Sequence, residues 1–203
     1  MKLLAINILR YEDSNSNVEP IILTGASDLS SFGFFQRGGV SEFITFISRL
    51  LAKRTEKGTR QQVEKDGYNC YVHSRTNNLV GVLVADQEYN PRVAFSVLYQ
   101  ALLDFEKKFT QKQWTDAKQD NDCDNASAIQ ALLTKYQNPT ETDDLLKIRK
   151  ELEETKAVMN QAIENVLHRG EKIDDLVDQS TDLSMSSKAF YNSVPDNSCC
   201  TIQ

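Results

Sequence analysis

The apolar positions change their spacing several times over the first 136 residues, and each change marks a predicted element. Alternating or continuous apolar runs predict five strands, at 3–9, 20–24, 60–64, 68–74 and 79–85. Apolar residues three or four positions apart predict three helices, at 41–54, 91–109 and 126–136. Asp66-Gly67 and Asn77-Asn78 favour tight hairpins between the last three strands. The order predicts an α+β fold in which a five-stranded antiparallel sheet is flanked by three helices.

The predicted helix 41–54 has an apolar face that is wider than packing against one sheet requires. Ser41 is a suitable N-terminal cap for it. Phe43 and Phe46 widen the face, and two interpretations remain open. They are either ordinary core side chains or part of a surface groove that receives another segment of the chain.

A different pattern begins after Asn138-Pro139, where apolar positions recur at alternating steps of three and four. Eleven of the fifteen positions on this seam are apolar, over seven heptads, which predicts a coiled-coil helix of roughly 75 Å. The rest of the helix surface is charged and polar, so the helix is expected to need partners or a docking surface. The seam positions are Leu145, Ile148, Leu152, Thr155, Met159, Ala162, Val166, Arg169, Ile173, Leu176, Ser180, Leu183, Ser187, Phe190 and Val194.

Charge divides the chain at the same place. Residues 1–140 carry 16 acidic and 16 basic side chains, whereas residues 141–194 carry 12 acidic and 7 basic ones, so the C-terminal part holds nearly all of the net charge of −6. This balance argues against a nucleic-acid partner. No apolar run approaches the roughly 20 residues of a spanning helix, and the four cysteines include no CxxC pair for zinc. We expect no metal and no cofactor.

Arg169 lies in the middle of the seam. A guanidinium in a coiled-coil core is costly unless acceptors from other helices meet its donors, and its tolerated use is to fix register and partner identity. The alternative is that Arg169 extends to solvent beside Gly170 and marks a weak point of the helix.

Around this arginine, residues 166–177 (Val-Leu-His-Arg-Gly-Glu-Lys-Ile-Asp-Asp-Leu-Val) resemble the central layer of an R-SNARE, of the synaptobrevin-like superfamily. The pattern of residues 1–136 is similar to the longin (profilin-like) domain that precedes the SNARE helix in one branch. Further segments look like the prenylated, lipid-anchored longin R-SNAREs of the Golgi and vacuolar pathways: 30–37, 42–46, 136–139, 187–191 and 197–200.

The resemblance implies a longin domain at 1–136, a linker at 137–144, a v-SNARE coiled-coil segment at 140–200 and a tripeptide, 201–203, removed after prenylation. It further implies fusion of vesicles in ER–Golgi, intra-Golgi, endosomal and vacuolar transport. Arg169 would then meet one glutamine from each of three Q-SNARE helices. A separate ATPase would disassemble the bundle, and the protein would divide between cytoplasm and the cytoplasmic side of these membranes.

The last four residues, Cys200-Thr201-Ile202-Gln203, fit a C-a-a-X prenylation motif. A prenyltransferase would attach farnesyl or geranylgeranyl to Cys200, which would end as a methyl ester. One lipid chain gives only marginal attachment, and residues 191–203 contain no basic side chain. Cys199 is therefore expected to carry a second lipid, either palmitoyl or prenyl.

An unpaired, lipid-bearing helix must hide its seam and its lipid. We therefore expect a closed form in which residues 137–194 fold back on the N-terminal domain, with Phe43 and Phe46 as candidate groove residues.

Two other classes of protein remain as alternatives to an R-SNARE. A prenylated small GTPase would need a phosphate-binding Gly-x-x-x-x-Gly-Lys-Ser/Thr loop, which is absent from the sequence. A lipid-anchored coiled-coil adaptor would have no use for Arg169. No catalytic residues are predicted.

Overall fold

The structure is a computed structural model that describes residues 2–12, 18–137, 159–168 and 170–193. Its sheet has the strand order β2-β1-β5-β4-β3-β6. All pairs within the first five strands are antiparallel, and β6 lies parallel to β3. The strands are β1 (Leu3–Arg10), β2 (Ile21–Ser27), β3 (Arg60–Lys65), β4 (Tyr68–Ser74), β5 (Leu79–Asp86) and β6 (Met159–Ala162).

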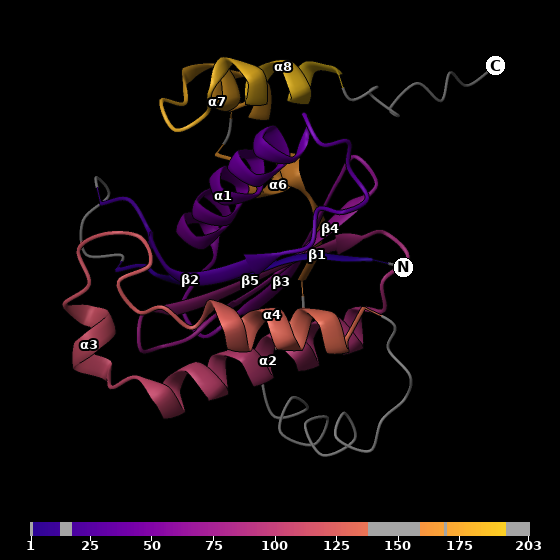
Figure 1. Cartoon of the computed structure of the whole chain (residues 1–203). Helices are drawn as coiled ribbons and strands as arrows, with labels where there is room; N and C mark the ends of the chain where they lie inside the picture. Colours follow the sequence, from indigo (N-terminus) through magenta and orange to yellow (C-terminus); the bar gives the residue numbers. More distant parts are fainter. Residues whose placement is uncertain (1, 13–17, 138–158, 169, 194–203) are drawn as a thin grey trace.

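Helices cover both faces of this sheet. α1 lies on one face, and α2 and α4 lie on the other (Figure 1). The C-terminal helices α6, α7 and α8 are on the α1 side. The helices are α1 (Arg37–Arg54), α2 (Pro91–Lys108), α3 (Gln111–Thr115), α4 (Ala126–Lys135), α6 (Ile163–Val166), α7 (Ile173–Gln179) and α8 (Met185–Ser193).

Local sequence explains the element ends. The Asn90 side chain accepts a hydrogen bond from the Arg92 N–H at 2.9 Å, and Pro91 occupies the first turn of α2. Asp66 and Gly67, with φ angles of 50° and 78°, form the predicted hairpin turn between β3 and β4. β1 and β5 are buried almost throughout because they are covered on both faces, which explains their nearly continuous apolar runs.

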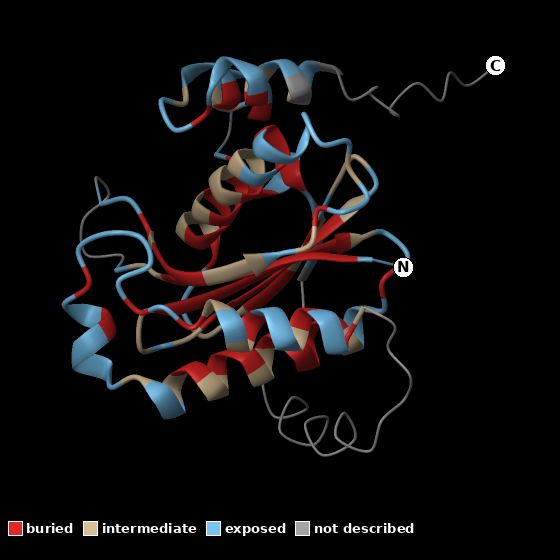
Figure 2. Cartoon of the chain, viewed as in Figure 1, coloured by how far each residue is buried: buried red, intermediate tan, exposed pale blue. Residues whose placement is uncertain are grey.

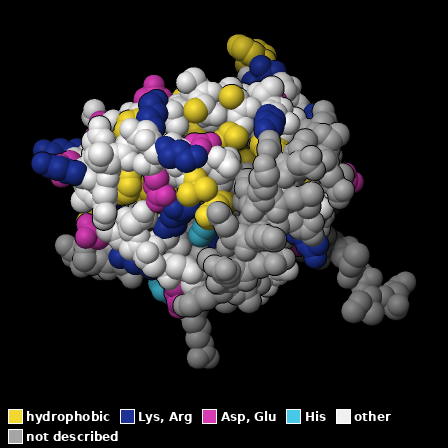
Figure 3. Space-filling view, turned by 90° about the horizontal axis from the view of Figure 1, so that it is seen from below, with side chains coloured by type: hydrophobic (Ala, Val, Ile, Leu, Met, Phe, Trp, Pro, Cys, Tyr) yellow, Lys and Arg dark blue, Asp and Glu magenta, His cyan; other side chains and the backbone are white. Residues whose placement is uncertain are grey.

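The sheet separates two apolar cores (Figure 2). The core under α2 and α4 contains large buried side chains such as Tyr71, Leu98 and Phe105. β5 and α2 approach so closely there that a Cβ on Gly81 would lie 2.7 Å from Leu98 Cδ1. On the outer surface of this side, acidic and basic side chains are interspersed over the visible part (Figure 3). The second core lies under α1 and includes residues of α6 and α7.

The five-stranded antiparallel sheet of the prediction is present, with three differences. α1 begins at Arg37, four residues before the predicted cap Ser41, and α3 is an additional short helix. The third difference concerns residues 159–193, predicted as one continuous helix. They form a strand and three short helices here, because β6 satisfies the open edge of β3 and the helices bury apolar side chains on the α1 face.

No helix among the described residues is both long enough and apolar enough to cross a membrane.

Candidate functional site

The candidate site is the contact between the C-terminal segment 159–193 and the domain formed by residues 2–137. β6 runs along the sheet edge, α6 follows it, and α7 and α8 lie over α1 (Figure 1). β6 aligns Gln61 with Met159 and Glu64 with Ala162. The Gln161 side-chain amide donates to the side-chain oxygen of Gln61, Oε1, at 2.8 Å. The first part of the contact is therefore strand addition to an existing sheet edge.

Apolar side chains form the second part of the contact. Four seam residues, Val166, Ile173, Leu183 and Ser187, are buried, whereas Leu176 and Ser180 are half-buried and Ala162 is exposed. Three apolar residues outside the seam are also buried, namely Ile163, Leu167 and Val177. The buried apolar residues of the segment share one core with α1 residues such as Ile47, Leu50 and Leu51.

Gly170 separates α6 from α7 with a φ of +92°. A right-handed helix requires a φ near −63°, so this residue cannot belong to a helix in the present conformation. The space around it is open, since an added Cβ would meet nothing within 4 Å. The backbone angle of Gly170 therefore breaks the segment where the seam prediction had a continuous helix.

An ion pair holds the chain just after this break. Arg54 Nη2, at the end of α1, lies 2.8 Å and 3.1 Å from the two carboxylate oxygens of Glu171. The same carboxylate accepts the His168 backbone N–H at 2.9 Å. This N–H and, after it, the Arg54 charge lower the pKa of Glu171, although burial opposes them. Glu171 therefore stays ionised, and the contact weakens only at pH values below the usual glutamate range.

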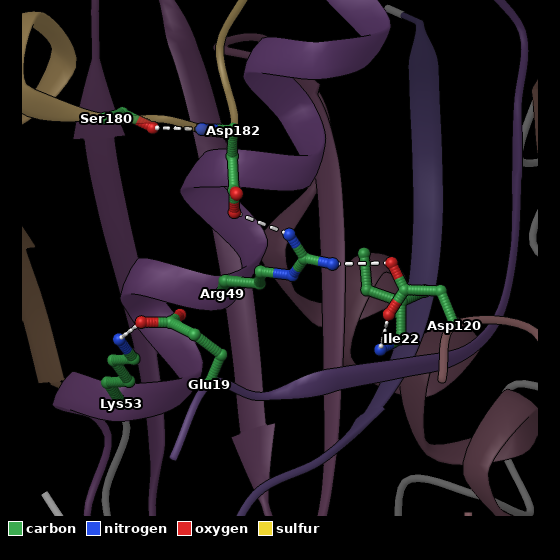
Figure 4. A network of polar contacts seen from close by, with 7 residues as sticks. All are labelled: Glu19, Ile22, Arg49, Lys53, Asp120, Ser180 and Asp182. Carbon is green, nitrogen blue, oxygen red and sulfur yellow. Dashed lines mark hydrogen bonds and ion pairs between the residues drawn. The ribbon is translucent and has the colours of Figure 1, made fainter. Parts of the chain in front are cut away.

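Arg49 links the segment to a second loop (Figure 4). Its guanidinium lies 2.6 Å from Asp182 and also pairs with Asp120. The Asp120 carboxylate in turn accepts the Ile22 N–H at 2.9 Å. On the same helix, Lys53 pairs with Glu19, which precedes β2. Arg49 thus bridges the C-terminal segment and the loop before α4.

Glu42 of α1 holds the beginning of α8. Its carboxylate accepts the Ser184 N–H at 2.9 Å and a hydrogen bond from the Ser187 hydroxyl. The Ser187 hydroxyl, followed by the Ser184 groups, lowers the pKa of Glu42. Ser184 also caps α8, because its hydroxyl accepts the Ser187 N–H at 3.3 Å. One carboxylate therefore fixes both the start and the first turn of this helix.

The candidate groove residues Phe43 and Phe46 are half-buried and pack at the edge of the α1 core. The Phe43 ring stacks on Tyr191 of α8 with centroids 5.2 Å apart. The Tyr191 hydroxyl donates to Asp174 at 2.6 Å, which ties α8 to α7. Phe46 lines a separate hollow together with Leu176. Both phenylalanines thus lie where the segment rests on α1.

A mostly apolar cavity of about 320 Å³ opens between α1 and the sheet beside Tyr191. This volume lies at the lower end of the range of small-ligand sites. Its apolar walls come from α1, the sheet, the loop before α1 and the C-terminal segment. The main apolar lining residues are Leu4, Phe32, Val40, Phe43, Ile44, Ile47, Val63, Val84, Ile163 and Tyr191.

Family models match the two parts of the chain separately. The longin model, described as a regulated-SNARE-like domain, matches residues 29–127, and the synaptobrevin model matches residues 144–194. A relative from Eremothecium gossypii named Synaptobrevin homolog YKT6 is 42% identical over 203 residues, which cover both chains completely. The chain belongs to the longin-domain R-SNAREs.

Other relatives of this R-SNARE indicate the same family. VAMP-like protein YKT61 from Arabidopsis thaliana is 43% identical over 203 residues and also covers both chains in full. Synaptobrevin homolog YKT6 from Saccharomyces cerevisiae is 41% identical over 181 residues, 89% of this chain and 90% of the relative. The predicted longin fold and R-SNARE function in vesicle trafficking, in a complex with SNARE partners, are confirmed. The family is one of SNARE proteins.

Part of the predicted site lies outside the described residues, and the side chains of Met159 and Phe190 are likewise not described. The positions outside are Leu145, Ile148, Leu152, Thr155, Arg169, Val194, Cys199 and Cys200.

Sequence reasoning on this R-SNARE missed the apolar residues outside the seam. The prediction treated that surface as charged and polar, which is wrong at Ile163, Leu167 and Val177. Their apolar character was the available signal, because a solvent-facing helix surface has no need of them. Arg54 and Glu42 carried no comparable signal, since charged residues are ordinary on exposed helix faces.

Proposed function

We propose that this R-SNARE alternates between the closed form described above and an open form that builds a fusion complex. In the open form, residues 140–200 form one helix of a four-helix bundle with three Q-SNARE helices. Zippering from Leu145 towards Val194 then draws the two membranes together as apolar surface is buried. A separate ATPase would take the bundle apart afterwards.

The burial of seam residues against α1 is the observation that supports this proposal. Val166, Ile173 and Leu183 are seam residues, and all three are buried in the same core as α1. A side chain cannot fill this core and a bundle layer at the same time. The closed form therefore competes directly with bundle assembly, and a partner can shift the equilibrium only through its preference for the open form.

Lipid attachment completes the proposed cycle. Cys200 would carry farnesyl or geranylgeranyl and a methyl ester, and Cys199 a palmitoyl or a second prenyl group. In the closed form, the apolar cavity beside Phe43 and Tyr191 would receive the prenyl chain, which supports a cytoplasmic pool of the protein. In the open form the lipids would hold the chain on Golgi, vesicle, endosomal or vacuolar membranes.

The prenylation motif acts only at a free carboxyl terminus, and a prenyltransferase would have to modify it. Mass spectrometry of the C-terminal peptide from the native protein identifies the lipids directly. An unmodified Cys200 would remove lipid anchoring from the proposal and leave bundle formation to be judged separately.

The role of Arg169 is tested in the assembled complex. We expect the full chain to form a 1:1:1:1 complex with three Q-SNARE helices. The Arg169→Leu variant would leave three glutamines without their charged partner and destabilise the complex by about 2–3 kcal/mol. Arg169→Lys should lie between, because lysine lacks the planar fork. Thermal unfolding of the purified complexes is the measurement.

His168→Leu is the matched control, since His168 is the exposed neighbour outside the seam. If Arg169→Leu and His168→Leu lower the unfolding temperature equally, Arg169 has no central-layer role. If no four-component complex forms with any Q-SNARE set, the proposal fails.

A further inference from the structure

Phe34 and Phe35 are adjacent aromatic side chains that point away from both cores. They are 77% and 96% exposed, and their rings contact each other edge to face with centroids 5.5 Å apart. Among the described residues, the other exposed large apolar side chains are the separate Val18 and Met185. A contiguous exposed aromatic pair is unusual on a protein surface and calls for an occupant.

The loop that carries the pair is held in shape by hydrogen bonds. Arg37 Nε donates to the Phe32 carbonyl at 3.1 Å, and its Nη2 reaches the Ser30 carbonyl at 3.4 Å. The Gln36 side chain accepts the Gly33 N–H at 3.2 Å, while its own backbone N–H donates to the Gly33 carbonyl at 2.8 Å. The loop therefore presents both rings without having to order itself first, which favours binding.

The loop that carries the pair lies near α8. Phe32 and Gln36, on either side of the pair, line the apolar cavity together with Tyr191 of α8. Cys200 follows Ser193, the end of α8, by seven residues. Since a chain spans at most about 3.6 Å per residue, Cys200 can be at most about 25 Å from that point. Once the lipid on Cys200 has left the cavity, it and the Phe pair can therefore reach the same membrane.

The chemistry of the loop fits a bilayer better than a protein partner. Residues 29–41 contain no acidic side chain and one basic one, Arg37, so an anionic membrane surface would not repel them. Segments that lie in the membrane interface typically combine Phe, Trp or Leu with Lys or Arg. A stable protein contact buries about 800 Å² on each partner, far more than two side chains supply, whereas a bilayer needs no complementary surface.

We propose that Phe34 and Phe35 insert into the bilayer interface and act as a second hydrophobic contact beside the C-terminal lipid. This inference rests on the lipid anchoring of the proposed function. In the form that carries a lipid on Cys200 alone, attachment is only marginal and reversible, so a small additional contact changes the bound fraction strongly. The Phe34→Ala/Phe35→Ala variant of the prenylated full chain should bind vesicles roughly tenfold more weakly.

The direct test places a fluorophore in the loop. The Phe35→Trp substitution is made in two forms of the full chain: the prenylated chain and the Cys200→Ser variant, which cannot be prenylated. Vesicles of phosphatidylcholine with one-fifth phosphatidylserine are added to each. The native Trp114 is 4% exposed and supplies a constant background. We expect a blue shift of the new tryptophan and quenching by brominated lipids. Val18→Trp is the control, because Val18 precedes β2 and the Phe pair follows the other end of that strand; its emission should stay unchanged.

The outcomes separate this inference from the anchor itself. If the prenylated chain binds vesicles while the Phe35→Trp emission stays unchanged, the inference is overturned and the anchor stands. If the Cys200→Ser chain also shows the blue shift and the quenching, the Phe pair binds membranes without the lipid, and the inference holds. Loss of vesicle binding by every form overturns both. A blue shift that requires an added Q-SNARE protein and no vesicles identifies a protein partner and overturns the inference.

Discussion

The Arg54 guanidinium contacts both oxygens of the Glu171 carboxylate, at the point where the C-terminal segment turns from α6 to α7. The two side chains are 17% and 31% exposed, so solvent screens the pair only in part. A single nitrogen, Nη2, makes both contacts, and the His168 backbone N–H donates to the same carboxylate and so holds its orientation. This pair therefore selects one position of the segment on α1 rather than only attracting it.

Charge reversal at this pair should open the closed form. Arg54→Glu places two carboxylates together and is expected to cost about 1 kcal/mol, which corresponds to roughly fivefold faster exchange of the α7 backbone amides with solvent deuterium. Adding Glu171→Arg should restore most of the protection. Hydrogen exchange read by mass spectrometry over residues 173–179 is the measurement.

Lys53→Glu provides the control from the same turn of α1, because Lys53 pairs with Glu19. Equal loss of α7 protection in Lys53→Glu and Arg54→Glu would mean that general charge, and not this pair, holds the segment.

At the scale of elements, Gly170 decides whether the segment is broken or continuous. Its φ of +92° suits glycine and strains any other residue, whereas a helix disfavours glycine by about 1 kcal/mol relative to alanine. Gly170→Ala should favour the open form through its effects on both forms. It strains the closed form by roughly 1 kcal/mol or more and stabilises the helix of the open form by about 1 kcal/mol.

We therefore expect Gly170→Ala to raise the open-to-closed ratio roughly thirtyfold, the factor that corresponds to about 2 kcal/mol. Circular dichroism should report more helix, and limited proteolysis should cut residues 159–193 faster. Gly67→Ala is the matched control, because Gly67 also has a positive φ, of 78°, and open space around it, yet lies in the β3–β4 turn. An unchanged cleavage rate in Gly170→Ala would show that the break does not limit opening.

Apart from the short helix α3, the elements of residues 1–136 were predictable because local pattern and final environment agree there. The Asp66-Gly67 turn, the Pro91 start of α2 and the buried run of β5 each allow one structure. The segment 159–193 was not predictable in the same way. Its heptad seam specifies a helix for partners outside the chain, whereas Ile163, Leu167 and Val177 suit burial against α1. One sequence serves two environments, and a single pattern describes only one of them.

The candidate site was also predictable only in part. The sequence alone places Phe43 and Phe46 on a wide apolar face, and the structure places both at the contact with the segment. Strand β6 gave no distinct signal, because Met159-Asn160-Gln161-Ala162 has neither β-branched residues nor a clear alternation. It forms because β3 offers an unpaired edge, which is a property of the sheet and not of the four residues.

At the scale of the whole molecule, a substitution of Val177 should affect closure of the chain without affecting the layers of the bundle. It is fully buried in the closed form, yet it lies one residue after the seam position Leu176 and would face outward in a bundle. Val177→Glu should therefore open the chain at a cost of about 3 kcal/mol or more to the closed form and leave the layers intact. Because only open molecules can zipper, the assembly rate is scaled by the open fraction.

We expect Val177→Glu to form the Q-SNARE complex at least tenfold faster than the wild type and with the same final thermal stability. Leu176→Glu is its neighbour and counterpart, since it alters a predicted layer while Leu176 is only half-buried in the closed form. It should lower the stability of the complex. Stopped-flow assembly and thermal unfolding of the product measure the two effects separately. Equal assembly rates for Val177→Glu and the wild type would contradict this prediction. Destabilising the closed form would then leave the rate of assembly unchanged, so closure would not control access to the seam.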